Sequence, residues 1–175
     1  MPFQNDINNI LEIGSGAGHK LAQLCWQLNA LGQGVDPSKT AVDFANKKYN
    51  QKCSYTVATA DDLSFFNNKF DLVHFGFCLY LVSRNKIDDV VKQADQLLKS
   101  GKFLSIIDFD PHDSHANEYA PFKGLKSYKT NYYKMFCDLG NYSVVNKFSY
   151  SEKSFCFSKN ENDRISLVLL FKENK

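Results

Sequence analysis

Hydrophobic residues along this chain form short apolar runs that alternate with stretches of helical periodicity. The apolar runs, each bounded by glycine, asparagine or charged residues, predict buried strands at 9–14, 32–36, 53–58, 70–77 and 101–109. The stretches with apolar positions at helical spacing predict helices at 17–31, 38–50 and 83–99. Strands that alternate with helices at this spacing favour a parallel sheet covered by helices on both faces.

The pattern changes after residue 109. Residues 110–127 are polar and predict no regular element, and 128–139 predict a helix. The last two apolar stretches, 142–150 and 164–173, predict strands with only an Asn-rich loop between them. A connection without a helix permits antiparallel pairing. The predicted fold class is therefore α/β, a doubly wound, mainly parallel seven-stranded sheet with an antiparallel C-terminal strand pair.

Composition supports one ordinary globular domain over residues 1–175. The chain has 43% hydrophobic and 23% charged residues, which is typical of a soluble domain large enough to bury a core. Its net charge of +2 gives no indication of nucleic-acid binding. Arg84 and Arg164 are the only arginines, and bidentate phosphate recognition favours arginine. We therefore expect no DNA partner, and an RNA partner is disfavoured.

The cysteines and the apolar runs indicate the compartment. Five cysteines form no C-x-x-C pair, which favours free thiols in a reducing environment. The first ten residues lack the regions of a signal peptide, and no apolar run approaches the ~20 residues that span a bilayer. A cytoplasmic protein without a membrane partner is the expectation.

The segment "LEIGSGAGHK" (11–20) places three glycines directly after the first predicted strand. Glycines at this point let the backbone approach a ligand closely. A dinucleotide fingerprint G-x-G-x-x-G would need its third glycine at position 19, where His19 stands. A Walker A loop would need Gly-Lys-Ser/Thr, which is absent. A nicotinamide-dependent oxidoreductase is thus a less favoured alternative.

The pattern E-x-G-x-G-x-G, which begins at Glu12, resembles motif I of the class I S-adenosylmethionine (SAM)-dependent methyltransferases. Three later stretches resemble the same family in the same order, namely "GVDPS", "VATADDLSFFNNKFDLV" and "HFGFCLYLVSR". The resemblance covers residues 9–109. It implies a Rossmann-like methyltransferase (EC 2.1.1.-) with SAM as cofactor and S-adenosylhomocysteine (SAH) as product.

The resemblance also implies where SAM binds. The glycine loop would carry its methionine end, and Asp36 would accept hydrogen bonds from the ribose hydroxyls. Strict alignment places Thr59 and Ala60 where the family's adenine-contacting residues stand. The acids Asp61 and Asp62 follow two and three positions later, so the alignment leaves open which side chain contacts the adenine. His19 either contacts the SAM carboxylate or faces solvent. The implied cofactor-binding residues are Glu12, Gly14, Ser15, Gly16, Gly18, His19, Asp36, Pro37, Thr59, Ala60, Asp61, Phe75 and Gly76.

The polar stretch "DFDPHDSH" (108–115) follows the fifth predicted strand, at the edge where such folds place their chemistry. A histidine there could deprotonate a hydroxyl acceptor, because its pKa lies near neutrality. A divalent-cation site and a plain polar loop are the alternatives, and we expect no metal. In the family, position 80 often faces the transferred methyl. The candidate catalytic residues are Tyr80, Asp108, His112 and His115.

The predicted function is methyl transfer to an O or N atom of a small molecule, such as a saccharide or a secondary metabolite. "HFGF" stands where nucleic-acid amino methyltransferases of the family carry "[DN]PPY". Family members usually have helices before motif I that cover SAM, whereas motif I here begins about ten residues in. We expect residues 110–135 to form a cap or substrate insertion, or a partner or second copy to supply one. A SAM- or SAH-binding module with little activity of its own is the alternative.

Overall fold

A computed structural model describes residues 6–121 and 124–174 of the chain. Residues 1–5, 122–123 and 175 lie outside the described residues. The first of these ranges belongs to the segment predicted to lack a signal peptide, and the second belongs to the predicted cap. The strands are β1 (Asn9–Ile13), β2 (Leu31–Asp36), β3 (Cys53–Val57), β4 (Phe70–Gly76), β5 (Leu98–Phe109), β6 (His115–Glu118), β7 (Lys126–Lys129), β8 (Tyr142–Ser151) and β9 (Arg164–Lys172). The helices are α1 (His19–Leu28), α2 (Lys39–Lys48), the short 3-10 helix η2 (Leu79–Leu81), α3 (Ile87–Leu97) and α4 (Tyr133–Cys137).

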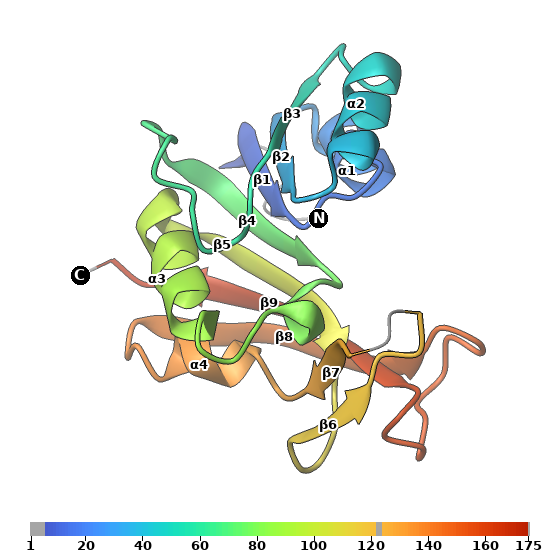
Figure 1. The fold of residues 1–175 in the computed structure, drawn as a ribbon. Helices are drawn as coiled ribbons and strands as arrows, with labels where there is room; N and C mark the ends of the chain where they lie inside the picture. Colours follow the sequence, from blue (N-terminus) through green and yellow to red (C-terminus); the bar gives the residue numbers. More distant parts are fainter. Residues whose placement is uncertain (1–5, 122–123, 175) are drawn as a thin grey trace.

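Seven strands form one sheet in the order β3-β2-β1-β4-β5-β9-β8 (Figure 1). The first five of these strands are mutually parallel, and β9 runs antiparallel to both of its neighbours, β5 and β8. The predicted mainly parallel seven-stranded sheet with its antiparallel C-terminal pair is therefore confirmed. Because β1 lies between β2 and β4, the loops that follow these three strands meet at one edge of the sheet.

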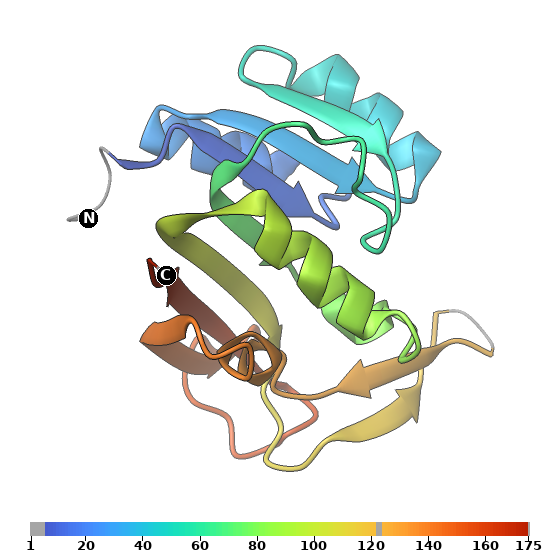
Figure 2. The ribbon, with the colours of Figure 1, turned by 90° about the vertical axis from the view of Figure 1, so that its left-hand side faces the viewer.

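Helices cover both faces of the sheet, as predicted. Figure 2 shows α3 in front of the sheet and α1 with α2 behind it. On the α1 face, Leu21 and Cys25 pack with Val42 of α2 and with Ile10 of β1. No helix within residues 6–121 and 124–174 has the length and apolar character needed to cross a membrane.

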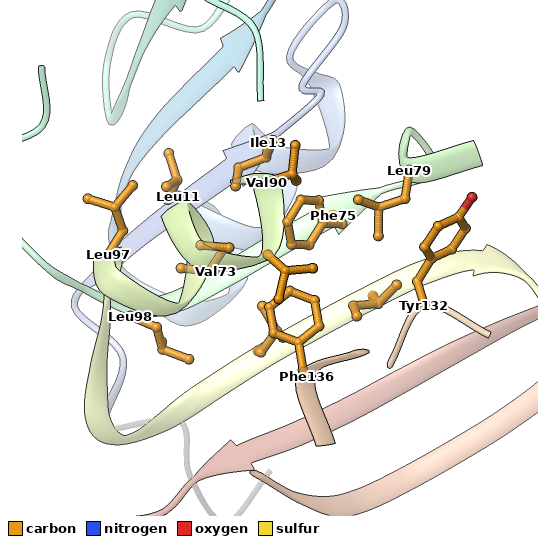
Figure 3. Close-up of a cluster of buried hydrophobic side chains, with 14 of the residues drawn as sticks. Leu11, Ile13, Val73, Phe75, Leu79, Val90, Leu97, Leu98, Tyr132 and Phe136 are labelled. Carbon is orange, nitrogen blue, oxygen red and sulfur yellow. The ribbon is translucent and has the colours of Figure 1, made fainter. Parts of the chain in front are cut away.

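The larger core lies on the opposite face, between the sheet and the helices α3 and α4 (Figure 3). Leu11 and Ile13 of β1 point into this core, whereas Ile10 points to the α1 face, as strand alternation requires. Phe136 of α4 is fully buried, and its ring centroid lies 6.0 Å from that of Phe75 in β4. Phe136 is the buried side chain of short α4, and Tyr133, Met135 and Cys137 pack partly buried against the same core.

The structure corrects the prediction that residues 110–127 form no regular element. They contain β6 and the start of β7, which pair as a separate antiparallel two-stranded sheet. The buried positions of β7 are Ser127 and Lys129, so the strand has no apolar alternation that could have predicted it. Lys129 is held by the carbonyl of Asn162, to which its Nζ donates a hydrogen bond of 2.8 Å.

All four predicted helices are shorter than expected. The predicted helix 17–31 becomes α1, which ends at Leu28, because Leu31 already begins β2; the predicted helix 38–50 becomes α2. The predicted helix 128–139 becomes α4 over five residues, because β7 extends through the start of that range. The predicted helix 83–99 becomes α3, which begins at Ile87 after a turn closed by the Lys86 N–H and the Ser83 carbonyl. At the other end, Leu98 already belongs to β5.

Candidate cofactor and acceptor site

The glycine loop after β1 folds back over the end of β2. The N–H groups of Gly14 and Ser15 both donate to the carbonyl of Val35, at 2.8 and 2.9 Å. The next amide, that of Gly16, donates to Oδ2 of Asp36 at 2.8 Å. The loop is therefore fixed by the last two residues of β2, which brings the predicted ribose-binding acid next to the predicted glycine motif.

The three glycines of the motif have different roles, although each has a positive φ. A Cβ at Gly14 would lie 2.5 Å from Cβ of Cys78, and one at Gly18 would lie 2.7 Å from Cζ of Tyr55. These two positions are glycine because protein atoms pack against them. At Gly16, with φ of +52°, a Cβ would meet nothing within 4 Å among the described residues. Gly16 thus presents bare backbone to open space, as a loop that receives a ligand requires.

Asp36 retains capacity to bind a ligand. Its Oδ1 accepts the Ser38 N–H at 2.9 Å and its Oδ2 accepts the Gly16 N–H. A carboxylate offers about four lone-pair positions, and two are used here. The remaining positions can accept hydroxyl hydrogen bonds. Pro37 is exposed and leads into α2, whose first turn Ser38 caps through the Ala41 N–H.

Glu12 is a buried acid with an unsatisfied oxygen. Its Oε2 has no hydrogen-bond partner among the described residues, and its Oε1 lies 3.9 Å from Nε2 of His74. Burial raises the pKa of Glu12 to about 8, although nearby Lys20 acts against this rise. Burial also lowers the pKa of His74 to about 4, and its Nδ1 lies 3.2 Å from Oγ of Ser105. Both shifts favour the neutral forms of Glu12 and His74 near pH 7, and His74 is hydrogen-bonded within the core.

Two further predicted residues flank this loop. Ser15 is buried, and its Oγ has no hydrogen-bond partner within the described part of the chain. His19 is exposed as the first residue of α1, where its side chain and the helix N-terminus can both meet an anionic group.

The segment after β3 contains the predicted adenine-binding residues. Asp61 Oδ2 accepts a hydrogen bond of 2.6 Å from Lys86 Nζ, which lowers the pKa of Asp61. The backbone carbonyl of Asp61 accepts a hydrogen bond from Gln93 of α3. These contacts attach the segment to the start of α3, leaving Thr59 exposed and Ala60 half-buried nearby. Asp61 therefore forms an ion pair with Lys86.

The end of β4 approaches the glycine loop from the other side. A Cβ at Gly76 would lie 2.5 Å from Oε1 of Glu12, so any larger residue there would displace the Glu12 carboxyl. The side chain of Phe75 points into the α3 core, so only its backbone is available at this edge. Phe77 follows with φ of +72°, which is uncommon for a bulky residue and marks the turn as strained.

An aromatic cluster, which sequence reasoning missed except for Tyr80, lies beyond this turn. The ring of Phe77 is 4.8 Å from that of Tyr80 and 5.0 Å from that of Phe109, measured between centroids. Tyr119 adds a ring 6.0 Å from Tyr80. The members come from three separate segments, at 77–80, 109 and 119, and the only sequence signal was the abundance of aromatic residues. Together they form an apolar wall where β4 and β5 end.

Among the four candidate catalytic residues, Asp108 and Tyr80 are linked by a hydrogen bond. Within the described residues, no hydrogen bond links His112 or His115 to either of them. Buried Asp108 accepts backbone N–H bonds from Tyr80 at 3.3 Å and Phe109 at 2.8 Å, and burial raises its pKa to about 7. His115 lies in β6, with its Nδ1 3.0 Å from the Asp113 carbonyl. His112 is exposed and has no hydrogen bond or ion pair within residues 6–121 and 124–174. In that same part of the chain, no cluster of three His, Cys, Asp or Glu side chains could hold a metal.

This strand order, with a glycine turn after β1, an acid ending β2 and a turn after β4 at one edge, defines the class I SAM-dependent methyltransferase fold. A family model described as "Methyltransferase domain" matches residues 10–101. The chain belongs to this family.

Relatives of known sequence or structure agree with this assignment. An uncharacterized methyltransferase of Synechocystis sp. is 26% identical in an alignment of 150 residues that covers 81% of this chain and 70% of that protein. The ubiquinone/menaquinone biosynthesis C-methyltransferase UbiE of Rickettsia typhi is 30% identical in an alignment of 117 residues that covers 61% of this chain and 46% of that protein. The chain thus spans less than half of UbiE.

A solved structure shares the fold at low sequence identity. It is the 1,6-didemethyltoxoflavin-N1-methyltransferase of Burkholderia thailandensis with bound 1,6-didemethyltoxoflavin and SAH. The match has a TM-score of 0.73 and 12% identity, and covers 95% of this chain and 71% of that one.

Proposed function

We propose that this protein binds SAM at the edge formed by the loops after β1, β2 and β4 and transfers a methyl group to an O or N atom of a small molecule. The observation that carries the proposal is the open space before Gly16, next to a carboxylate with free lone pairs and near a buried acid with an unsatisfied oxygen. These features fit a ligand with a ribose and an ammonium group.

Each residue has a role that its chemistry supports. The unsatisfied Glu12 oxygen would accept a hydrogen bond from the cofactor's ammonium, and Asp36 would accept those of the ribose diol. Thr59, Ala60 and Asp61 would border the adenine. When bound, SAM supplies a methyl group already activated by its sulfonium. The protein's main task is then to align the acceptor, since orientation can supply roughly 7–11 kcal/mol of a barrier.

The acceptor would lie against the wall formed by Phe77, Tyr80, Phe109 and Tyr119. Asp108 would position this wall by holding the backbone of Tyr80, and a hydroxyl acceptor would lose its proton to Asp108, His112 or His115. A small-molecule acceptor is supported by the toxoflavin methyltransferase of the same fold, which holds one.

The segment 110–135 would cover this acceptor site. Arg84, just after η2, stacks over the ring of Tyr128 in β7 at 4.5 Å. Lys129 of the same strand lies 4.1 Å over the ring of Phe109. These contacts place the β6–β7 hairpin beside the aromatic wall. Free thiols at all five cysteines support a reducing compartment, and we propose the cytoplasm.

A SAH-binding module with little activity of its own is the second candidate. It is favoured by the exposure of His112, which leaves that base without an orienting partner in the described structure.

Calorimetric titration of SAH into the full chain, with NADH as a parallel control, tests the proposal. We expect micromolar binding of SAH and none of NADH. Binding of NADH alone would overturn the cofactor assignment. Binding of SAH without methyl transfer from labelled SAM to a panel of small alcohols and amines would favour the second candidate.

A further inference from the structure

A pocket of about 520 Å³ lies on the α1 face of the sheet, apart from the proposed cofactor edge. One wall is formed by Leu24 of α1 and the opposite wall by Phe148 of β8, while Phe103 of β5 and Leu169 of β9 lie between them. The volume is within the range of pockets that hold small molecules, roughly 300–1,000 Å³. The methyl-transfer proposal makes no use of this pocket.

Among the six polar side chains of this largely apolar lining, which also include Gln23, Gln27 and Asn146, three are paired across neighbouring strands or carry the pocket's charge. They are Lys20 of α1, His74 of β4 and Ser105 of β5. His74 and Ser105 are 4% and 9% exposed and lie opposite each other in neighbouring strands, with Nδ1 and Oγ 3.2 Å apart. Polar side chains on an otherwise apolar sheet face are informative, because burial costs them free energy unless they are hydrogen-bonded.

The charge in the pocket has one sign. The described lining residues include no Asp or Glu, and Lys20 is their only cation. Glu12 lies behind His74, at 3.9 Å from its Nε2, and does not line the pocket. Lys20 Nζ donates a long hydrogen bond of 3.4 Å to the Gly76 carbonyl, and an ammonium group has further donors for another acceptor.

We propose that this pocket binds an amphiphile with one carboxylate head and an apolar body. Charge complementarity and lining chemistry support this occupant. The head accepts hydrogen bonds from Lys20, with the neutral His74–Ser105 pair beside it, and the body lies along Leu24, Phe103 and Leu169. The inference does not rest on the proposed methyl transfer, because no residue assigned to SAM lines the pocket; Lys20 contacts the cofactor edge through the Gly76 carbonyl.

Decanoate, decanol and decyltrimethylammonium, each below its micellar concentration, are suitable probes in calorimetric titrations of the full chain. They share a ten-carbon chain and differ in the head group. We expect decanoate to bind with one-to-one stoichiometry, decanol at least about tenfold more weakly, and the cation not at all, since one charge-assisted hydrogen bond accounts for a tenfold change. Equal affinity for decanoate and decanol would overturn the assigned head group.

Two leucines of similar exposure provide a matched pair of variants. Leu167 lines the pocket and is 41% exposed, whereas Leu139 is 39% exposed and does not line it. Leu167→Glu should abolish decanoate binding and Leu139→Glu should leave it unchanged. Lys20→Gln should reduce decanoate affinity about tenfold and leave decanol affinity unchanged.

Folding of each variant is checked by circular dichroism, and light scattering gives the oligomeric state. Decanoate binding that survives both Leu167→Glu and Lys20→Gln would place the ligand elsewhere and refute the proposal. A dimer that Leu167→Glu dissociates, without decanoate binding to the wild type, would refute it too, and would assign this face to contact between two copies.

Discussion

Gly16→Leu should abolish SAH binding while leaving the protein folded. Gly16 has φ of +52° and a Cβ there would meet no described atom within 4 Å, so the substitution introduces no clash within the protein. Its cost to the fold is the strain of a left-handed conformation, about 1–2 kcal/mol. For a chain of this length, each kcal/mol lowers the melting temperature by roughly 2–4 °C, so the decrease should be about 2–8 °C.

Gly140→Leu is a matched control for this substitution. Gly140 has φ of +76° and also faces open space among the described residues, but it follows α4, away from the glycine loop. The backbone strain is therefore comparable, and only the proposed ligand space differs. Both variants should lose similar stability in thermal denaturation, whereas only Gly16→Leu should lose SAH binding in calorimetry.

Two results would refute this reasoning. SAH binding by Gly16→Leu with wild-type affinity would show that the space before Gly16 is not the cofactor site. Equal loss of binding in both variants would show that general destabilisation, and not occupation of the site, is responsible.

Three other predictions concern the site and the core. Asp36→Ala should weaken SAH binding roughly ten- to hundredfold in calorimetry, because hydrogen bonds to a carboxylate contribute about 1.5–3 kcal/mol. The control variant Asp43→Ala, on the exposed face of α2, should not change SAH binding. Burial raises the pKa of Glu12 from 4.5 to about 8, so the native state retains a proton that the unfolded state releases between these values. The free energy of unfolding in urea should therefore fall from pH 5 to pH 8, and Glu12→Gln should reduce that fall; an unchanged fall would contradict the assigned pKa. Phe136→Ala should destabilise the protein by about 3–5 kcal/mol in urea denaturation, whereas Phe148→Ala, at a position that is 55% exposed, should destabilise it by less than about 0.5 kcal/mol. Similar losses of stability in the two variants would contradict the packing of α4.

The sheet could be predicted from the sequence because its strands carry continuous apolar runs. Residues 70–77 and 101–109 show this most clearly, and both became central parallel strands. The β6–β7 hairpin could not be predicted in this way. Its buried positions include Lys129, which is satisfied by Asn162, a residue 33 positions away. Polar residues whose burial depends on hydrogen-bond partners far away in the sequence leave no local hydrophobic pattern.

The candidate site was predictable to the level of its loops, but not to that of individual contacts. The spacing of the glycines located the loop after β1, yet it could not distinguish Gly16, which faces open space, from Gly14, which packs against Cys78. That difference depends on a residue 64 positions further along the chain. The pairing of Asp61 with Lys86 is likewise a tertiary contact between separate segments. Such contacts are set by the fold and are not visible in spacing.

The position of β9 affects the order in which the chain can fold during synthesis. β9 is the last strand of the described chain, but it lies inside the sheet, between β5 and β8. β5 therefore has no partner on that side until residue 172 has been made, 21 residues after β8 ends. At about 5–20 residues per second, the ribosome needs roughly 1–4 s for that stretch. During this interval β5 and β8 have unpaired edges, which can pair with a strand of another chain.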